Sequence, residues 1–235
     1  MDVNKYLSLR KRLDDLIAQS SYREVESDFL YPNEIKFADE YLKNKTQYVI
    51  SGGRKDAIKQ KIFFTTNTLV CLQAKYNSKY RLLKHKDVLG ALFNVGITHD
   101  SFGDIYVDDQ QVIVYCSLTT SKIIISNLTK INQMNIKFKS VPFIDFEDKY
   151  LSYFDTCSSL RIDNVCAMIT NLSRSKVNEL FLSQYVMLNY EICENYSTTI
   201  EKYDIISLRY YGKYRILDCQ LNKKNKYKIS YIKYD

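Results

Sequence analysis

Basic side chains gather near the C-terminal end of this chain, where few acidic residues balance them. Residues 205–234 contain eight basic residues and one acidic residue, namely Arg209, Lys213, Arg215, Lys223, Lys224, Lys226, Lys228 and Lys233 against Asp218. The whole chain has 34 basic and 27 acidic residues and a net charge of +7, so the remaining 26 of each sign cancel. Concentrated positive charge is typical of a protein that binds a polyanion, either nucleic acid or an anionic membrane. A solvated basic tail is the alternative.

Two further cations stand at the start of a predicted helix, Arg174–Ser183. Ser173 is a natural N-cap for this helix. Arg174 and Lys176 lie in the first turn, where positive charges oppose the helix dipole and cost roughly 0.3–1 kcal/mol each when exposed. A bound phosphate reverses that penalty, because helix N-termini and cations both attract anions. The spacing therefore indicates either an anion-binding hairpin or an ordinary helical hairpin with exposed charges.

The elements that position these cations follow from the spacing of apolar residues. A first helix is predicted over Arg161–Ile169, and a short turn separates it from the second. Four strands are then predicted, over residues 185–189, 204–209, 214–217 and 227–231, with a turn at 223–226. This unit is expected to span residues 157–235.

The upstream chain reads as two further regions and a linker. Residues 1–66 are predicted to be mostly helical, with Pro32 as an interruption and a basic stretch after Gly53. Residues 67–141 have the order β-α-β-β-α-β of a ferredoxin-like or RRM-like plait. Its elements are expected at 68–73, 85–94, 104–107, 111–115, 119–131 and 135–139, and residues 142–156 are expected to form a linker. The predicted fold class is α+β.

The motifs of the last unit resemble the S4-type RNA-binding domain. In chain order they are Arg161-Ile162-Asp163, Ser173-Arg174-Ser175-Lys176, Val186-Met187-Leu188-Asn189, Asp204–Arg209 and Gly212-Lys213-Tyr214. Tyr203 departs from the pattern, which usually has a glycine there. The upstream segments Leu83–Leu92, Val95–Ile97 and Gly103–Ile105, together with Ser51–Gly53, are similar to the signature of the bacterial YlmH family. The resemblance covers most of the chain.

The resemblance implies an RNA-binding factor of ribosome-associated quality control, without a cofactor or metal. Such proteins bind the large ribosomal subunit that carries a stalled peptidyl-tRNA. With a partner that elongates the peptide, they support the addition of a C-terminal alanine tail. The implied phosphate contacts are Arg161, Arg174, Lys176 and Arg209, the implied hydrogen-bond donors are Ser173, Ser175 and Asn189, and Lys213 and Arg215 widen the basic face. His85 and Lys86 are a possible secondary RNA contact.

Other classes of function have less support in the sequence. The same RNA-binding domain occurs beside modifying enzymes, so an RNA-modifying or ribosome-assembly protein is the alternative, but no phosphate-binding loop or deaminase signature is present. His85 and Asp87 stand at a helix start, where capping explains them better than acid–base catalysis. No apolar run approaches the ~20 residues of a membrane helix. The six scattered cysteines and the charged N-terminus predict reduced thiols in a cytoplasmic protein, expected to be monomeric off the ribosome.

Overall fold

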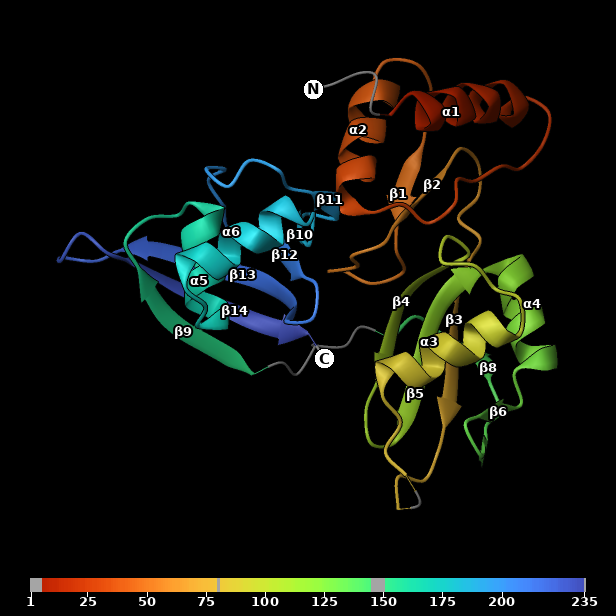
Figure 1. Ribbon diagram of the computed structural model, residues 1–235. Helices are drawn as coiled ribbons and strands as arrows, with labels where there is room; N and C mark the ends of the chain where they lie inside the picture. The colour runs from red at the N-terminus through yellow and green to blue at the C-terminus, as the bar shows by residue number, and fades with distance from the viewer. Residues whose placement is uncertain (1–5, 80, 145–150, 235) are drawn as a thin grey trace. The chain divides into compact units, whose positions relative to one another are not determined.

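Two compact units make up the chain, Met1–Glu147 and Asp148–Asp235. The computed structural model describes residues 6–79, 81–144 and 151–234 (Figure 1). Each unit has its own hydrophobic core and combines helices with antiparallel strands. The predicted α+β class is therefore confirmed.

The first unit begins with two helices and a small sheet. They are α1 (Leu7–Ser20), α2 (Pro32–Leu42) and the antiparallel pair of β1 (Val49–Ser51) and β2 (Lys61–Phe63). Pro32 occupies the first turn of α2, where its missing N–H removes no helical hydrogen bond, so it begins a helix. The fully buried side chains that join these elements are Leu13, Ala38, Leu42 and Ile62.

A four-stranded antiparallel sheet in the order β4-β5-β3-β8 forms the rest of this unit (Figure 1). Along the chain the elements are β3 (Leu69–Lys75), α3 (His85–Asn94), β4 (Phe102–Val107), β5 (Gln111–Ser117), α4 (Leu118–Asn127), β6 (Lys130–Ile131), β7 (Met134–Asn135) and β8 (Lys139–Val141). The predicted helix over 85–94 is confirmed. The predicted helix over 119–131 is too long, because α4 ends at Asn127 and Ile131 is buried from a β-hairpin instead. The predicted strand at 135–139 is divided between β7 and β8.

Residues of the YlmH-like motifs close a loop onto this sheet. The Asp104 carboxylate accepts hydrogen bonds from the backbone N–H groups of Ile58 and Lys59, at 2.9 and 3.1 Å. Gly53 has a φ of +87°, and a Cβ at this position would lie 2.4 Å from the Tyr115 ring. The glycine is therefore required both by its backbone conformation and by the close approach of the ring.

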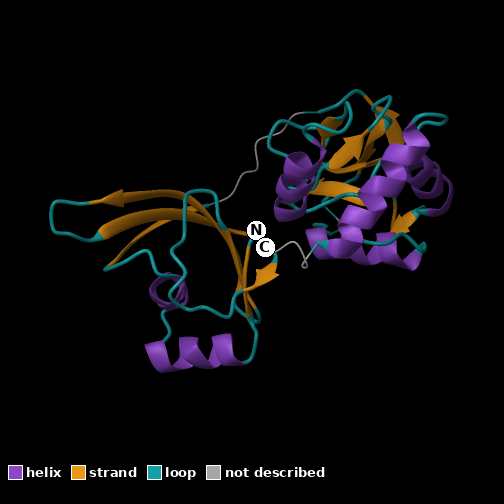
Figure 2. Ribbon diagram, turned by 90° about the horizontal axis from the view of Figure 1, so that it is seen from above, coloured by secondary structure: helices purple, strands orange, loops and turns teal. Residues whose placement is uncertain are grey.

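The second unit is a six-stranded antiparallel sheet with a helical hairpin on one side (Figure 2). Its elements are β9 (Ser152–Cys157), α5 (Ile162–Thr170), α6 (Arg174–Leu182), β10 (Val186–Leu188), β11 (Glu191–Ile192), β12 (Ile205–Leu208), β13 (Gly212–Leu221) and β14 (Tyr227–Tyr234). The strand order is β11-β10-β12-β13-β14-β9. Both helices pack against one sheet face. The core between them includes Val165, Cys166 and Val177 of the helices and Ile206 and Ile216 of the strands.

Strand β9, except for its last residue Cys157, lies in the stretch 142–156 for which the sequence predicts a linker. It pairs with β14 at the edge of the sheet, with Tyr153 opposite Tyr231. All its side chains before Cys157 are exposed, so no apolar alternation marks it in the sequence. Residues 145–150 of the expected linker lie outside the described residues.

The six cysteines are free thiols, and all but Cys219 are buried. Burial raises the pKa of Cys116 to about 12 and that of Cys219 to about 11. In the described part of the chain no helix has the length and apolar character to cross a membrane.

Candidate nucleic-acid interface

The helical hairpin presents two cations at the start of α6. Asn171 ends α5 in a left-handed conformation, with a φ of 56°. The Ser173 hydroxyl accepts a hydrogen bond from the Lys176 backbone N–H at 3.4 Å, so the predicted N-cap is confirmed. The Ser173 and Ser175 hydroxyl oxygens are 3.0 Å apart, and the side chains of Arg174 and Lys176 are exposed. This helix start combines two cations with the positive end of the helix dipole, an arrangement that attracts anions.

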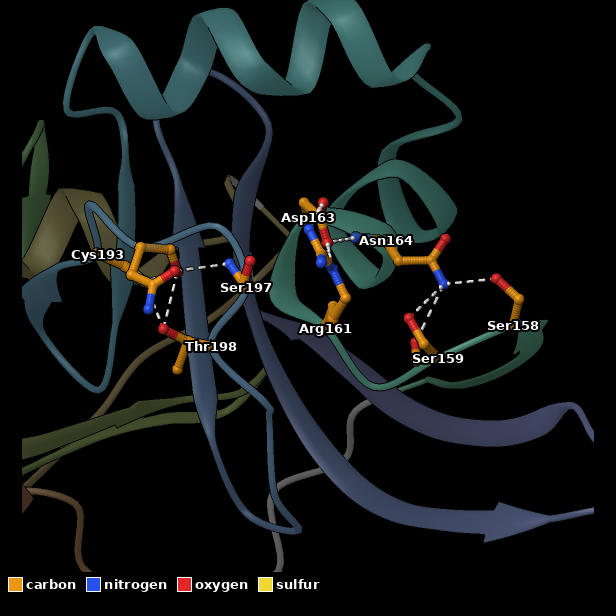
Figure 3. A network of polar contacts seen from close by, with 9 residues as sticks. Ser158, Ser159, Arg161, Asp163, Asn164, Cys193, Ser197 and Thr198 are labelled. Atoms are coloured by element: carbon orange, nitrogen blue, oxygen red, sulfur yellow. Dashed lines mark hydrogen bonds and ion pairs between the residues drawn. The ribbon is translucent and has the colours of Figure 1, made fainter.

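Arg161, the residue before α5, is paired with a carboxylate (Figure 3). Its guanidinium donates two hydrogen bonds to Asp163, at 3.1 Å from Nε and 2.8 Å from Nη2. These bonds lower the pKa of Asp163, and the charge of Arg174 adds to the effect. The Asn164 amide donates to the Ser158 hydroxyl at 3.0 Å and so fixes the segment that leads into α5. Arg161 is exposed and held in place, but its charge is already balanced.

Both polar atoms of the Asn189 side chain form hydrogen bonds within the fold. Its Oδ1 accepts a hydrogen bond from the Ile205 N–H at 2.8 Å, and its Nδ2 donates to the Asp204 carboxylate at 2.7 Å. The side chain is half-buried and its φ is 51°. Asn189 therefore ties the turn after β10 to the start of β12, and the sequence motif has a structural explanation at this position.

The basic residues of β13 lie on the sheet face that the helices leave uncovered. Tyr214 and Ile216 belong to the core beneath α5 and α6. Because side chains alternate along a strand, Lys213 and Arg215 point to the opposite face, which we call the open sheet face because no helix covers it. Both side chains are half-buried there. They therefore do not extend the basic surface at α6, contrary to what the sequence suggested, and the predicted RNA-binding residues fall on two sides of the unit. We call the exposed side chains at the start of the helices the hairpin surface, made of Arg161, Ser173, Arg174, Ser175 and Lys176.

Cations lie over aromatic rings on the open sheet face and at its ends. Arg209 Cζ is 4.7 Å from the ring centre of Tyr185 and 5.3 Å from that of Tyr210. Three further pairs have cation-to-ring distances of 4.9, 5.5 and 5.4 Å: Lys213 with Tyr190, Arg215 with Tyr203, and Lys228 with Phe154. A positive charge near a ring face is favourable by itself, and the combination of rings and cations is also what single-stranded nucleic acids bind.

The sequence did not point to these aromatic residues, apart from Tyr203 as a departure from the family pattern. The one hint in the sequence was that several tyrosines of this unit stand next to predicted turns. With 21 tyrosines in the chain, that signal does not stand out from the composition. Only the strand register shows which tyrosines share a face with the cations.

His85 and Lys86 belong to the other compact unit and are exposed in the first turn of α3. Asp87 accepts a hydrogen bond from the Lys84 N–H at 2.9 Å and so caps this helix. That bond lowers the pKa of Asp87. Within residues 6–79, 81–144 and 151–234 there is no group of three or more His, Cys, Asp or Glu side chains placed to hold a metal.

Comparison with known proteins finds similarities in part of the first unit and along most of the chain. Residues 66–145, which include β3 to β8, match a family model described as "Putative RNA-binding domain in YlmH". The "Ribosome-associated protein quality control protein P2" of Bacillus subtilis (strain 168) is 27% identical over 233 residues, an alignment that covers 92% of this chain and 89% of that protein. A solved structure of the "Cell division protein ylmH from Streptococcus pneumoniae" is 21% identical, with a TM-score of 0.47, and the match covers 60% of this chain and 89% of that one.

Proposed function

The chain belongs to the YlmH family, and we propose that it is an RNA-binding factor of ribosome-associated protein quality control. The RNA-binding domain matched in the first unit and the name of the Bacillus subtilis relative support this proposal. The concentration of positive charge over residues 205–234, within the second unit, agrees with an RNA partner. In this proposal the protein acts by binding, without a catalytic step.

We further infer that the second unit is an S4-type domain and that the four-stranded sheet of the first unit is an RRM-like plait. In this proposal the protein binds large ribosomal subunits that carry a stalled peptidyl-tRNA, contacts ribosomal RNA and the tRNA, and supports C-terminal alanine tailing with an elongating partner. The order of helices and strands in both units is compatible with these assignments. Because the proposed binding site is the ribosome, we expect the protein to act in the cytoplasm.

The observation that carries the proposal is the start of α6. Arg174 and Lys176 are exposed within one helical turn, next to a serine N-cap. Without an anion, two cations at this helix end are unfavourable by roughly 0.3–1 kcal/mol each. A phosphate group of folded RNA offsets the unfavourable interaction of both cations with the helix dipole. The phosphate accepts hydrogen bonds from the cations and itself interacts favourably with the dipole.

The test is co-sedimentation of the full chain with large ribosomal subunits over a range of salt concentrations. The Arg174→Ala/Lys176→Ala variant removes two phosphate contacts. Its affinity should fall, and the slope of log K against log salt should flatten by about 1.8, since each phosphate contact contributes about 0.9. Both side chains are exposed, so the variant should fold normally.

The matched control is Lys11→Ala/Lys36→Ala, which removes the same charge from exposed positions on α1 and α2. It should change neither the affinity nor the salt slope by more than a general charge effect. Equal co-sedimentation of wild type and Arg174→Ala/Lys176→Ala at every salt concentration would discard the hairpin surface as the ribosome contact.

A further inference from the structure

Three tyrosines at the ends of strands in the second unit have a backbone conformation that bulky residues rarely adopt. Tyr190, Tyr203 and Tyr210 have φ values of 69°, 74° and 73°. A non-glycine residue with positive φ is uncommon, and for a large side chain it is an outlier. Glycine adopts this conformation freely, and Tyr203 stands where the family pattern has glycine. These positions therefore carry aromatic rings in spite of the local backbone preference.

Each of the three rings lies beside a cation of the open sheet face or its end. Lys213 Nζ is 4.9 Å from the centre of the Tyr190 ring, and Arg215 Cζ is 5.5 Å from that of Tyr203. Tyr210 has Arg209 Cζ at 5.3 Å from its ring centre. The unfavourable backbone conformation thus coincides three times with the same local chemistry, a ring next to a positive charge.

The rings that flank β12 are open to solvent. Tyr203 precedes the strand and is 58% exposed, whereas Tyr210 follows it and is 78% exposed. Seven residue steps separate the two tyrosines, which at roughly 3.3 Å per residue is at most about 23 Å. Between them, Lys213 and Arg215 stand on the neighbouring strand, opposite Ser207 and Ile205.

Unpaired nucleotides are the ligand that this pattern fits. Base faces stack on aromatic rings, and the phosphates between the bases pair with the cations. Double-stranded RNA does not offer its base faces, so it cannot use the rings. An acidic protein segment could use the cations, but it would leave the exposed rings without a partner of matching shape.

We propose that the open sheet face is a second RNA-binding surface, which stacks unpaired bases on Tyr203 and Tyr210 and pairs their phosphates with Arg209, Lys213 and Arg215. This second surface extends the proposed function. The choice of RNA as the polyanion rests on that proposed function. The surface is separate from the hairpin surface, because strand alternation places it on the other side of the sheet. The two can therefore be tested independently.

The experiment measures binding of the full chain to a fluorescent oligouridine of about ten nucleotides, a length within the site sizes of single-strand-binding folds. Fluorescence anisotropy is recorded at several salt concentrations, and the same RNA annealed to its complement is the duplex control. The Tyr203→Gly/Tyr210→Gly variant should bind the single strand at least about tenfold more weakly. The salt slope should stay unchanged, because no phosphate contact is lost.

Two other variants separate stacking from charge. Tyr203→Phe/Tyr210→Phe keeps the rings and should bind like wild type. Lys213→Gln/Arg215→Gln should flatten the salt slope by about 1.4, since a phosphate contact to a single strand contributes about 0.7. Glycine relieves the backbone at both tyrosine positions, so the thermal midpoint of the glycine variant should not fall. Tyr22→Ala, an exposed tyrosine of the first unit, is the control for ring removal elsewhere.

Equal affinity of wild type and Tyr203→Gly/Tyr210→Gly for the single strand would overturn the proposal. So would a wild-type preference for the duplex, or loss of binding in Tyr22→Ala of the same size. None of these outcomes bears on ribosome co-sedimentation through Arg174 and Lys176, so failure here is distinguishable from failure of the proposed function.

Discussion

Replacing Asn189 by alanine tests whether this motif residue stabilises the fold or contacts RNA. The Ile205 N–H donates to its side chain at 2.8 Å, and its amide donates to the Asp204 carboxylate at 2.7 Å. The neutral bond contributes about 1 kcal/mol and the charge-assisted bond about 1.5 kcal/mol. Alanine at a φ of 51° is unfavourable by about 1 kcal/mol more. Asn189→Ala should therefore lower the free energy of unfolding by about 3.5 kcal/mol.

Asn225 provides the matched control for this variant. It has a nearly identical φ of 53° and is exposed in the turn between β13 and β14. Asn225→Ala therefore carries only the conformational penalty of about 1 kcal/mol. The difference between the two variants, about 2.5 kcal/mol, isolates the side-chain hydrogen bonds.

The assay is urea unfolding followed by far-UV circular dichroism and by tyrosine fluorescence, since the chain has no tryptophan. Two transitions are fitted because the chain has two compact units, and only the transition of the second unit should move. An equal decrease in the free energy of unfolding for Asn189→Ala and Asn225→Ala would refute the structural role of Asn189. A loss of RNA affinity in a fully stable Asn189→Ala protein would do the same.

Three further variants have expected outcomes. Glu26→Gln leaves the buried ammonium of Lys61 without its counter-charge and should destabilise the first unit by about 2 kcal/mol, which an unchanged urea midpoint would contradict. Gly53→Ala combines a φ of +87° with a Cβ at 2.4 Å from the Tyr115 ring, so a loss of about 2 kcal/mol or more is expected in the same assay. The pKa of Asp163 is lowered from 3.8 in the folded state, so its ion pair stabilises the protein above that pH and stops doing so as the pH falls through the folded value. The urea midpoints of wild type and Asp163→Asn should therefore differ at pH 6 and converge in acid; a constant difference would argue against the pair.

Local chemistry explains what the sequence predicted well. The N-cap at Ser173 and the helix over 85–94 depend on residues within a few positions of each other, and both are confirmed. The two predicted helices of the hairpin also agree with α5 and α6 within one residue at each end. In these segments the apolar spacing and the turn residues indicate the same element.

Features that depend on distant residues could not be predicted in this way. Strand β9 has exposed side chains and exists because β14 pairs with it, more than 70 residues later in the chain. The hydrogen bonds of Asn189 join two strands, so its motif reads equally well as an RNA contact. The separation of Lys213 and Arg215 from the hairpin surface depends on which face Tyr214 and Ile216 bury.

In the two proposals above, the six-stranded sheet carries RNA-binding cations on both of its sides, so the second unit would be a bivalent binder. One side carries the positive start of α6, and the other carries the β13 cations and their rings. When two weak contacts share one rigid body, the second forms at the effective concentration set by the first, and avidity can exceed either affinity by about 10²–10⁴-fold. A ribosome that presents folded and unpaired RNA together would retain this protein, whereas either kind of RNA alone would release it quickly.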